Sequence, residues 1–117
     1  MTTSKCQHGD IVLVEFVFTQ GGGSKKRPAY VLSCLDYHKS RNEVILAAIT
    51  SNTSVLRVGD TKIKDWKAAG LLFPSLVSGI IQTVKRSIVI KKIGRLSARD
   101  ATNVETNLRL ALALNGE

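Results

Sequence analysis

Three glycines and three cations lie side by side in the stretch TQGGGSKKRPAYVLS, which runs from Thr19 to Ser33. The guanidinium of Arg27 can offer parallel N–H donors to a phosphate, and the two preceding lysines add positive charge. A second basic cluster follows later in the chain and consists of Lys85, Arg86, Lys91, Lys92 and Arg95. Clustered cations favour a phosphate-backbone partner over a surface that is merely solvated.

The charge of the whole chain has the same sign. Seventeen Lys and Arg residues stand against nine Asp and Glu residues, which gives a net charge of +8 and a pI of about 9.9. Such a surface attracts polyanions. The sequence therefore indicates a nucleic acid as the partner to test first.

Other residues that could do chemistry give weaker signals. His8 and His38 could serve as acid and base at neutral pH, but nothing in their spacing brings them together, and we interpret both as surface residues. Cys6 and Cys34 form no CxxC motif and no histidines stand at ligand spacing, so we expect neither a metal site nor a disulfide framework.

Size and hydropathy limit the class of protein. A chain of 117 residues with 44% hydrophobic content is typical of one domain with one modest core, so we expect a single domain over residues 1–117. No segment approaches the roughly 18 apolar residues of a membrane span, and the first ten residues lack the apolar stretch of a secretory signal. We expect a cytoplasmic protein with no membrane partner.

The elements that must position these residues are mostly short strands. Runs rich in β-branched and apolar residues predict strands over 10–18, 28–35, 43–51, 61–64, 76–84 and 87–93. Residues 36–42 are interpreted as a polar turn, 65–70 as one helical turn, and 97–114 as an amphipathic helix whose Ser97 and Asp100 resemble a capping box. Together they predict a mainly β fold with α: a small, strongly bent antiparallel barrel with a C-terminal helix over one end.

Four segments in this order resemble the MazF/PemK family of toxins from bacterial toxin–antitoxin modules: HGDIVLVEF, RPAYVLS, AAITS and KKIGRLS. The resemblance implies an SH3-like barrel, a homodimer, and a metal-independent endoribonuclease without a cofactor. It also implies two partners, single-stranded RNA as substrate and a cognate antitoxin whose disordered tail silences the enzyme. Alternating leucines in the last helix are compatible with a dimer, although the same helix could simply be well buried.

The family pattern points to two catalytic residues. The arginine before the proline is Arg27, which we expect to stabilise the charge that develops on the phosphate, because its high pKa makes it a poor proton shuttle. The hydroxyl at the end of the third strand is Thr50, which can donate to a phosphate oxygen, and Ser51 could share that work. Taken singly, each residue could equally be an ordinary surface or strand residue.

The late strand departs from the family pattern. Many members place a carboxylate and a glutamine where this chain has Gly79 and Ile80, and no carboxylate lies between Asp65 and Asp100. A general base from this strand is therefore not expected, and the proton acceptor is left open. Gln82 could contact RNA or face solvent.

The remaining expectations concern RNA binding. We expect GGGSKK to form a mobile basic flap with Arg27 at its junction with a strand, and we expect the RNA to be bound by Lys25, Lys26, Ser51, Gln82, Lys85 and Arg86. Trp66 is interpreted as a packing residue rather than a base-stacking one, and Tyr30 could face either way. Two other functions stay open: a gyrase-directed toxin of the same fold, and a non-catalytic RNA-binding barrel.

Overall fold

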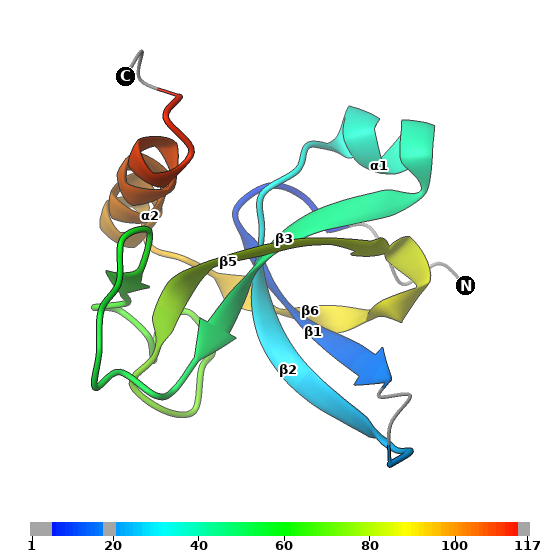
Figure 1. The fold of residues 1–117 in the computed structure, drawn as a ribbon, viewed down its shortest axis with the longest axis horizontal. Helices are drawn as coiled ribbons and strands as arrows, with labels where there is room; N and C mark the ends of the chain where they lie inside the picture. Colours follow the sequence, from blue (N-terminus) through cyan, green and yellow to red (C-terminus); the bar gives the residue numbers. More distant parts are fainter. Residues whose placement is uncertain (1–5, 18–20, 115–117) are drawn as a thin grey trace.

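The fold is a six-stranded antiparallel sheet with a helix at each side, in a computed structural model that describes residues 6–17 and 21–114 (Figure 1). The elements in chain order are β1 (Asp10–Val17), β2 (Ser24–Val31), α1 (Leu35–Arg41), β3 (Glu43–Thr50), β4 (Thr61–Lys62), β5 (Leu76–Lys85), the 3₁₀ turn η1 (Arg86–Ile88), β6 (Val89–Arg95) and α2 (Ala98–Ala111). The mainly β class predicted from the sequence is confirmed. Phe18, which was expected to end the first strand, lies outside the described residues.

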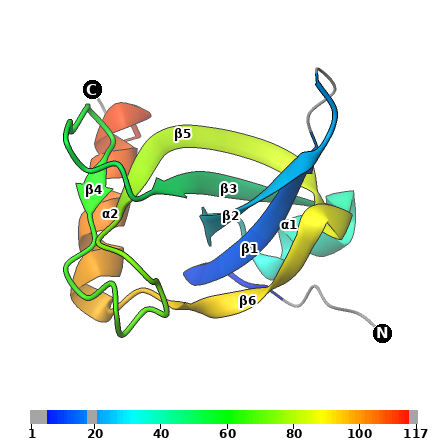
Figure 2. The same cartoon turned by 90° about the horizontal axis from the view of Figure 1, so that it is seen from below.

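The sheet curls on itself but stays open. Its strand order is β4-β5-β3-β2-β1-β6, and within the described residues no ladder joins β4 to β6. The segment after β4 covers the opening, because a side chain at Gly94 of β6 would clash with the carbonyl of Ala69. Figure 2 shows this segment beside β6, with α2 behind it. The expected barrel is thus not closed by hydrogen-bonded strands among the described residues, and a loop in contact with β6 covers its opening.

The core divides into two apolar clusters along the central strands. One cluster lies against α2 and includes Tyr30, Ile49, Val77 and Val104; the other includes Val12, Val31 and Leu46. Strand β3 contributes to both, because alternate side chains of a strand point to opposite faces. Strand β3, predicted over 43–51, therefore crosses the middle of the core.

Strand β2 begins earlier than the sequence predicts. Its first residues pair only with β1, from Ser24 opposite Val17 to Pro28 opposite Leu13, and β3 joins only at Ala29. The two strands therefore extend beyond the sheet as a ribbon (Figure 1). Lys25 and Lys26 therefore lie in a strand and not, as expected, in a glycine-rich loop before it. The error has a physical cause: both faces of these positions are exposed, and no apolar alternation marks the strand.

The polar stretch after β2 is also a helix and not a turn. Helix α1 ends at Asn42, whose left-handed backbone (φ 55°) stops it. His38 is fully buried within it, and its Nε2 lies 2.6 Å from the Ser33 hydroxyl, which also accepts the Ile45 N–H. The surface interpretation of His38 is therefore wrong. The helix was missed because seven residues carry too little apolar periodicity to be recognised.

The C-terminal helix begins where it was predicted. The Ser97 hydroxyl accepts the Asp100 N–H, as in a capping box. The buried Asp100 carboxylate turns outward from the helix, however, and accepts the backbone N–H groups of Lys64 and Asp65 at 3.0 and 2.8 Å. These bonds fix α2 to the end of β4. The helix ends at Ala111, three residues before the predicted boundary.

Candidate active site

The two predicted catalytic residues line one pocket. Its volume is about 240 Å³, and its lining includes Arg27 and Pro28 of β2, Thr50 and Ser51 at the end of β3, and the loop residues Leu72 and Phe73. The strand register explains the meeting: Ala29 lies opposite Ala48, and continuing that register by two residues brings Arg27 opposite Thr50. Because the ladder stops at Ala29, the strands open here and leave room for a ligand.

Arg27 is held by its backbone and free at its tip. It pairs with Val14 on β1, so it lies within a strand and not, as expected, at the end of a flexible loop. Its side chain is exposed, and among the described residues no carboxylate or carbonyl engages the guanidinium. Its donors are therefore available to an anion in the pocket.

Thr50 has a half-engaged hydroxyl. Its Oγ1 accepts the Asn52 N–H at 3.1 Å, a bond that fixes the start of the following loop. A hydroxyl carries one donor and two acceptor sites, so the hydrogen of Thr50 is still available. Within the described part of the chain nothing accepts it. The pocket thus presents a guanidinium, unpaired among the described residues, on a fixed strand and a hydroxyl donor, a combination that can bind a phosphate group.

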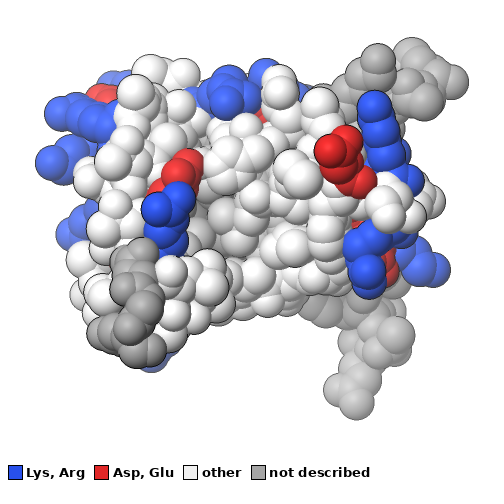
Figure 3. Space-filling model, turned by 90° about the horizontal axis from the view of Figure 1, so that it is seen from above, with Lys and Arg blue, Asp and Glu red and all other residues white. Residues whose placement is uncertain are grey.

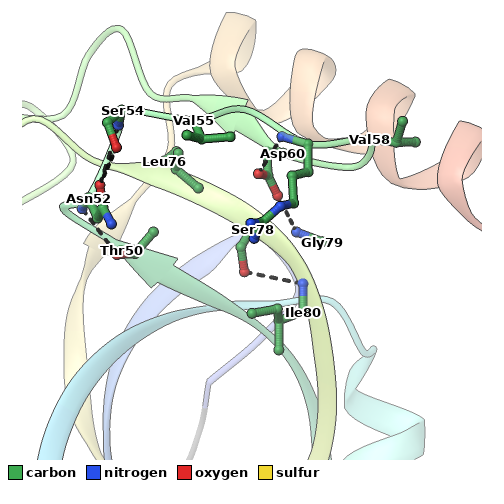
Figure 4. A pocket seen from close by; sticks show the side chains of 11 residues that line it. Thr50, Asn52, Ser54, Val55, Val58, Asp60, Leu76, Ser78, Gly79 and Ile80 are labelled. Carbon is green, nitrogen blue, oxygen red and sulfur yellow. Dashed lines mark hydrogen bonds between the residues drawn. The ribbon is translucent and has the colours of Figure 1, made fainter.

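A second pocket of about 380 Å³ lies on the other side of Thr50. It is polar, and its lining includes Thr50 and Asn52, Arg57 and Asp60 from the β3–β4 loop, and Ser78 of β5 (Figure 4). Thr50 is the residue that the two pockets share.

A bulge in β5 forms the floor of this second pocket. Ala47 pairs with Ile81 and Ile49 with Val77, so Ala48 alone faces three residues of β5. The backbone N–H groups of the bulge have other partners: Gly79 donates to the Asp60 carboxylate at 2.8 Å, and Ile80 donates to the Ser78 hydroxyl at 3.2 Å (Figure 4). Bulges of this kind commonly adjoin active sites.

Asp60 places a carboxylate beside Gly79, in a strand that has no carboxylate of its own. Gly79 stands at the position that is acidic in many toxins of the resembled family, and it lets the loop approach closely, since an added Cβ would lie 3.2 Å from the Val58 carbonyl oxygen. Asp60 reaches this point from the loop and also accepts the Arg57 N–H at 2.9 Å. Sequence reasoning missed Asp60 because it searched only the strand.

The other predicted RNA-binding residues divide into two groups. Lys25 and Lys26 are exposed on the β1–β2 ribbon that leads to Arg27, and Ser51 lines its pocket. Gln82 is exposed on β5 but lines neither pocket. Lys85 pairs with Glu43, and Arg86 donates its N–H to Asn42, so both lie at the opposite end of β3 from Thr50, roughly 20 Å away along the strand.

One face of the molecule shows how the charges are spread. In Figure 3, Lys and Arg side chains gather toward the two ends and at the upper edge, and a broad region without charged side chains lies in the middle of this face. Exposed leucines at the end of α2, Leu110, Leu112 and Leu114, are apolar surface without cover in the described chain.

Among the described residues no three His, Cys, Asp or Glu side chains are grouped as metal ligands, and no helix there is long and apolar enough to cross a bilayer.

The family is decided by a comparison with protein-family models. Residues 7–112 match the model of PemK-like, MazF-like toxins of type II toxin–antitoxin systems, which covers both pockets and nearly the whole described fold. This chain belongs to that toxin family. A comparison with curated protein sequences returns no match.

Solved structures of MazF proteins share the fold. A chain of the MazE–MazF crystal structure (Form-III) from Deinococcus radiodurans matches with a TM-score of 0.76 at 20% identity, covering 92% of this chain and 96% of that one. The Mycobacterium tuberculosis toxin MazF-mt6 gives 0.68 at 21%, covering 87% and 96%. A mycobacterial endoribonuclease in complex with its cognate antitoxin gives 0.69 at 16%, covering 93% and 96%. At such identities the likeness concerns the fold.

The opening Gly-Asp signature of this MazF-like toxin has a structural task. Asp10 is 1% exposed; its carboxylate accepts Arg95 Nη1 at 2.6 Å and the Gln7 N–H at 3.0 Å, and Lys92 Nζ lies 3.3 Å away. Gly9 has a φ of 96°, and an added Cβ would lie 2.7 Å from Arg95 Nη2. The first and last matching segments, HGD and KKIGR, are therefore joined by an ion pair whose two residues line neither pocket.

The two histidines of the toxin have opposite environments. His8 is exposed; Nδ1 lies 2.8 Å from the Leu32 carbonyl and Nε2 3.0 Å from Glu105. Burial lowers the pKa of His8, but the hydrogen bonds to Glu105 and Leu32 outweigh it and raise the pKa above its usual value. Burial and the charge of Arg86 lower the pKa of His38. Neither histidine lines the pockets that Thr50 shares.

The exposed aromatic of the toxin's pocket is neither of the two weighed from sequence. Tyr30 is fully buried, and burial together with the charge of Glu105 raises its pKa to about 12. Trp66 is half-buried against the core, as expected of a packing residue. Phe73 is instead 63% exposed and lines the pocket of Arg27. The run GLLFPS gave no signal, because three consecutive apolar residues suggest burial.

Proposed function

We propose that this toxin is a sequence-selective endoribonuclease that cuts single-stranded RNA without a metal ion, with Arg27 and Thr50 as its catalytic residues. The observation that carries the proposal is the shared pocket, in which the guanidinium of Arg27 and the hydroxyl of Thr50 both keep free donors. A polyanion is the substrate that suits these donors and the net charge of +8.

The reaction follows from the chemistry of RNA. The 2′-hydroxyl oxygen attacks the neighbouring phosphorus, the bond from phosphorus to the 5′-oxygen breaks, and the products are a 2′,3′-cyclic phosphate and a 5′-hydroxyl. The proton lost by the 2′-hydroxyl goes to a base, and the 5′-oxygen gains one. No water and no oxidant enter this step.

Arg27 and Thr50 act on the charge and not on the protons. The guanidinium of Arg27 neutralises the crowded dianionic phosphorane as it forms, which is the role of a preorganised donor. The free hydrogen of Thr50 binds one non-bridging oxygen and holds the phosphate in line with the attacking oxygen. Asp60 lines the adjoining pocket, where both of its oxygens accept backbone N–H groups, from Arg57 and Gly79, so its role there is to hold the loop.

The partners follow the family. We include in the proposal a cognate antitoxin that blocks the pocket and a homodimer formed through apolar surface such as Leu110, Leu112 and Leu114. Lys25 and Lys26 on the ribbon would bind the RNA backbone next to the cut. Light scattering of the purified protein tests the dimer, and a monomer at high concentration would remove that part.

The experiment that tests the activity uses a long unstructured RNA. The purified protein is incubated with it, with and without a chelator, and the 5′ ends of the fragments are sequenced. We expect cuts at a defined sequence in both samples. Salt-dependent binding without cuts would identify a non-catalytic RNA-binding barrel, and inhibition of gyrase without either would identify a gyrase-directed toxin.

A further inference from the structure

The two pockets that meet at Thr50 differ in chemistry. The smaller one is bounded by apolar side chains, with Phe73 63% exposed and Leu72 83% exposed beside Arg27. The larger one adds an amide and charged groups, from Asn52, Arg57 and Asp60, to a lining that also holds apolar side chains such as Val55 and Leu76. A residue that contacts phosphate between two such pockets would have one nucleotide of a single strand on each side.

Phe73 has the properties of a stacking residue. Phe73 and Leu72 form an exposed apolar pair beside Arg27, and exposed apolar surface next to polar groups is typical of ligand-binding sites. A nucleobase stacks on an aromatic face whatever its sequence, and the flanking guanidinium of Arg27 can bind the phosphate of the same nucleotide. The pocket volume of about 240 Å³ has room for a single base.

The larger pocket can read a base by hydrogen bonds. The Oδ1 of Asn52 accepts both the N–H and the hydroxyl of Ser54, at 3.4 and 2.8 Å, so the amide is fixed in orientation. Its NH₂ group has no acceptor among the described residues and is available to a base edge. Arg57 lines the same pocket, and its side chain has no carboxylate partner within the described chain.

We propose that these pockets are the two nucleotide subsites that flank the cut, the apolar one binding a base by stacking on Phe73 and the polar one reading the adjacent base through Asn52. The inference rests on the proposed function for its substrate. It goes beyond that function by assigning base recognition to residues that the catalytic pair does not include. Thr50, which lines both pockets, marks the position of the phosphate between the two nucleotides.

The test is a cycle of protein and RNA changes measured by binding. Short RNA oligonucleotides that carry one abasic residue, moved along the strand position by position, are titrated with wild-type protein, Phe73→Ala and Asn52→Ala. We expect Phe73→Ala to weaken binding about 10-fold and Asn52→Ala about 5-fold on intact RNA. For each variant, the difference in affinity from the wild type should disappear when one particular nucleotide is abasic. The nucleotide found with Phe73→Ala and the one found with Asn52→Ala should be neighbours.

Two variants control for structure. Phe73→Tyr keeps the aromatic face and should bind RNA as the wild type does. Leu35→Ala truncates an exposed apolar residue on α1, remote from both pockets, and should change binding at no position. Phe73 and Asn52 are exposed, so replacing either should hardly change the stability of the fold. A thermal melt of every variant checks this and separates lost recognition from lost folding.

The outcomes of binding and cleavage are distinct. A coupling here is an abasic position at which the effect of a protein substitution disappears. If the two couplings lie at neighbouring nucleotides and the RNA is cut between them, both proposals are supported. If they lie at neighbouring nucleotides and the RNA is not cut, the subsites are supported and catalysis is overturned. A site-specific cut with couplings at distant positions, or at none, overturns the subsites and leaves catalysis standing. Loss of affinity for a protein partner, with RNA binding unchanged, would identify Phe73 as a peptide contact and overturn the inference. Failure to bind RNA at all would overturn both.

Discussion

The two regions that carry the family signature differ in how their polar groups are engaged. At the start of β1, Asp10 binds Arg95 and the Gln7 N–H, and His8 binds Glu105. At the opening between β2 and β3, the guanidinium of Arg27 and the hydrogen of Thr50 have no acceptor among the described residues. Charged groups that satisfy each other hold a fold, and groups left unsatisfied are available to a ligand. The difference assigns structure to the first region and chemistry to the second.

The largest effect should come from Arg27→Ala. Loss of the guanidinium removes the main charge stabilisation of the transition state, so the cleavage rate should fall about 100- to 1,000-fold. Stability should hardly change, because the side chain is exposed. Single-turnover cleavage and thermal melts measure the two effects. Lys26→Ala, an exposed cation one residue away, is the matched control and should lose only a few-fold in binding. A well-folded Arg27→Ala that still cleaves at the wild-type rate would contradict the assignment.

Asp10→Ala should give the reverse pattern. The change leaves the Gln7 N–H without its acceptor and Arg95 without its partner, which should cost about 2–3 kcal/mol of the free energy of unfolding. The cleavage rate per folded molecule should be unchanged, because Asp10 lines neither pocket. Denaturation in urea and single-turnover kinetics below the midpoint measure both. An Asp10→Ala variant that is as stable as the wild type but cleaves RNA more slowly would contradict the comparison between the two regions.

Thr50→Val should have a smaller effect within the pocket. The substitution keeps the shape of the side chain and removes the hydroxyl, so we expect the cleavage rate to fall about 10-fold. Ser51 lines the same pocket and can supply part of the lost contact. Thr50→Ser keeps the hydroxyl and should cleave as the wild type does. Equal losses in both variants would mean that packing at the end of β3, and not the hydroxyl, is what matters.

The smallest effect concerns pH at the engaged region. The folded pKa of His8 is raised, so its contribution to stability is fully present below the unfolded value of about 6.5 and is lost as the pH rises through the folded pKa. Glu105→Gln should therefore destabilise the protein by less than about 1 kcal/mol at about pH 5.5 and by nothing at about pH 8.5, since the pair is half-exposed. Urea midpoints at both pH values measure it. A pH-independent difference would assign the Glu105 effect to packing.

Much of the fold was predictable because hydrophobic periodicity is strong where one face is buried. Strand β3 and helix α2 show it, and both were expected at nearly their observed positions. The ribbon at the start of β2 has no buried face, and α1 has only seven residues, so neither gave a periodic signal. Local sequence patterns report burial, whereas the ribbon is formed by its backbone pairing with β1.

The candidate site was predictable only in part. Arg27 and Thr50 were named from the family pattern, and the β2–β3 register now explains why they share a pocket. Asp60 and Phe73 were not found, because the bulge that brings Asp60 to Gly79 and the exposure of Phe73 arise from tertiary packing. Lys85 and Arg86 were placed near the RNA on charge alone, and charge does not tell which end of a strand faces the substrate.

The claim that the pocket cuts RNA through its own 2′-hydroxyl is tested most directly with a deoxy substitution. Once the cut is mapped, an RNA is made in which only the nucleotide on the 5′ side of the cut lacks its 2′-hydroxyl, together with a control RNA that has the same change one nucleotide further away. The account predicts that the first RNA stays intact while the control is cut to give a 5′-hydroxyl end. Cleavage of both RNAs at the same rate, or products with a 5′-phosphate, would contradict it.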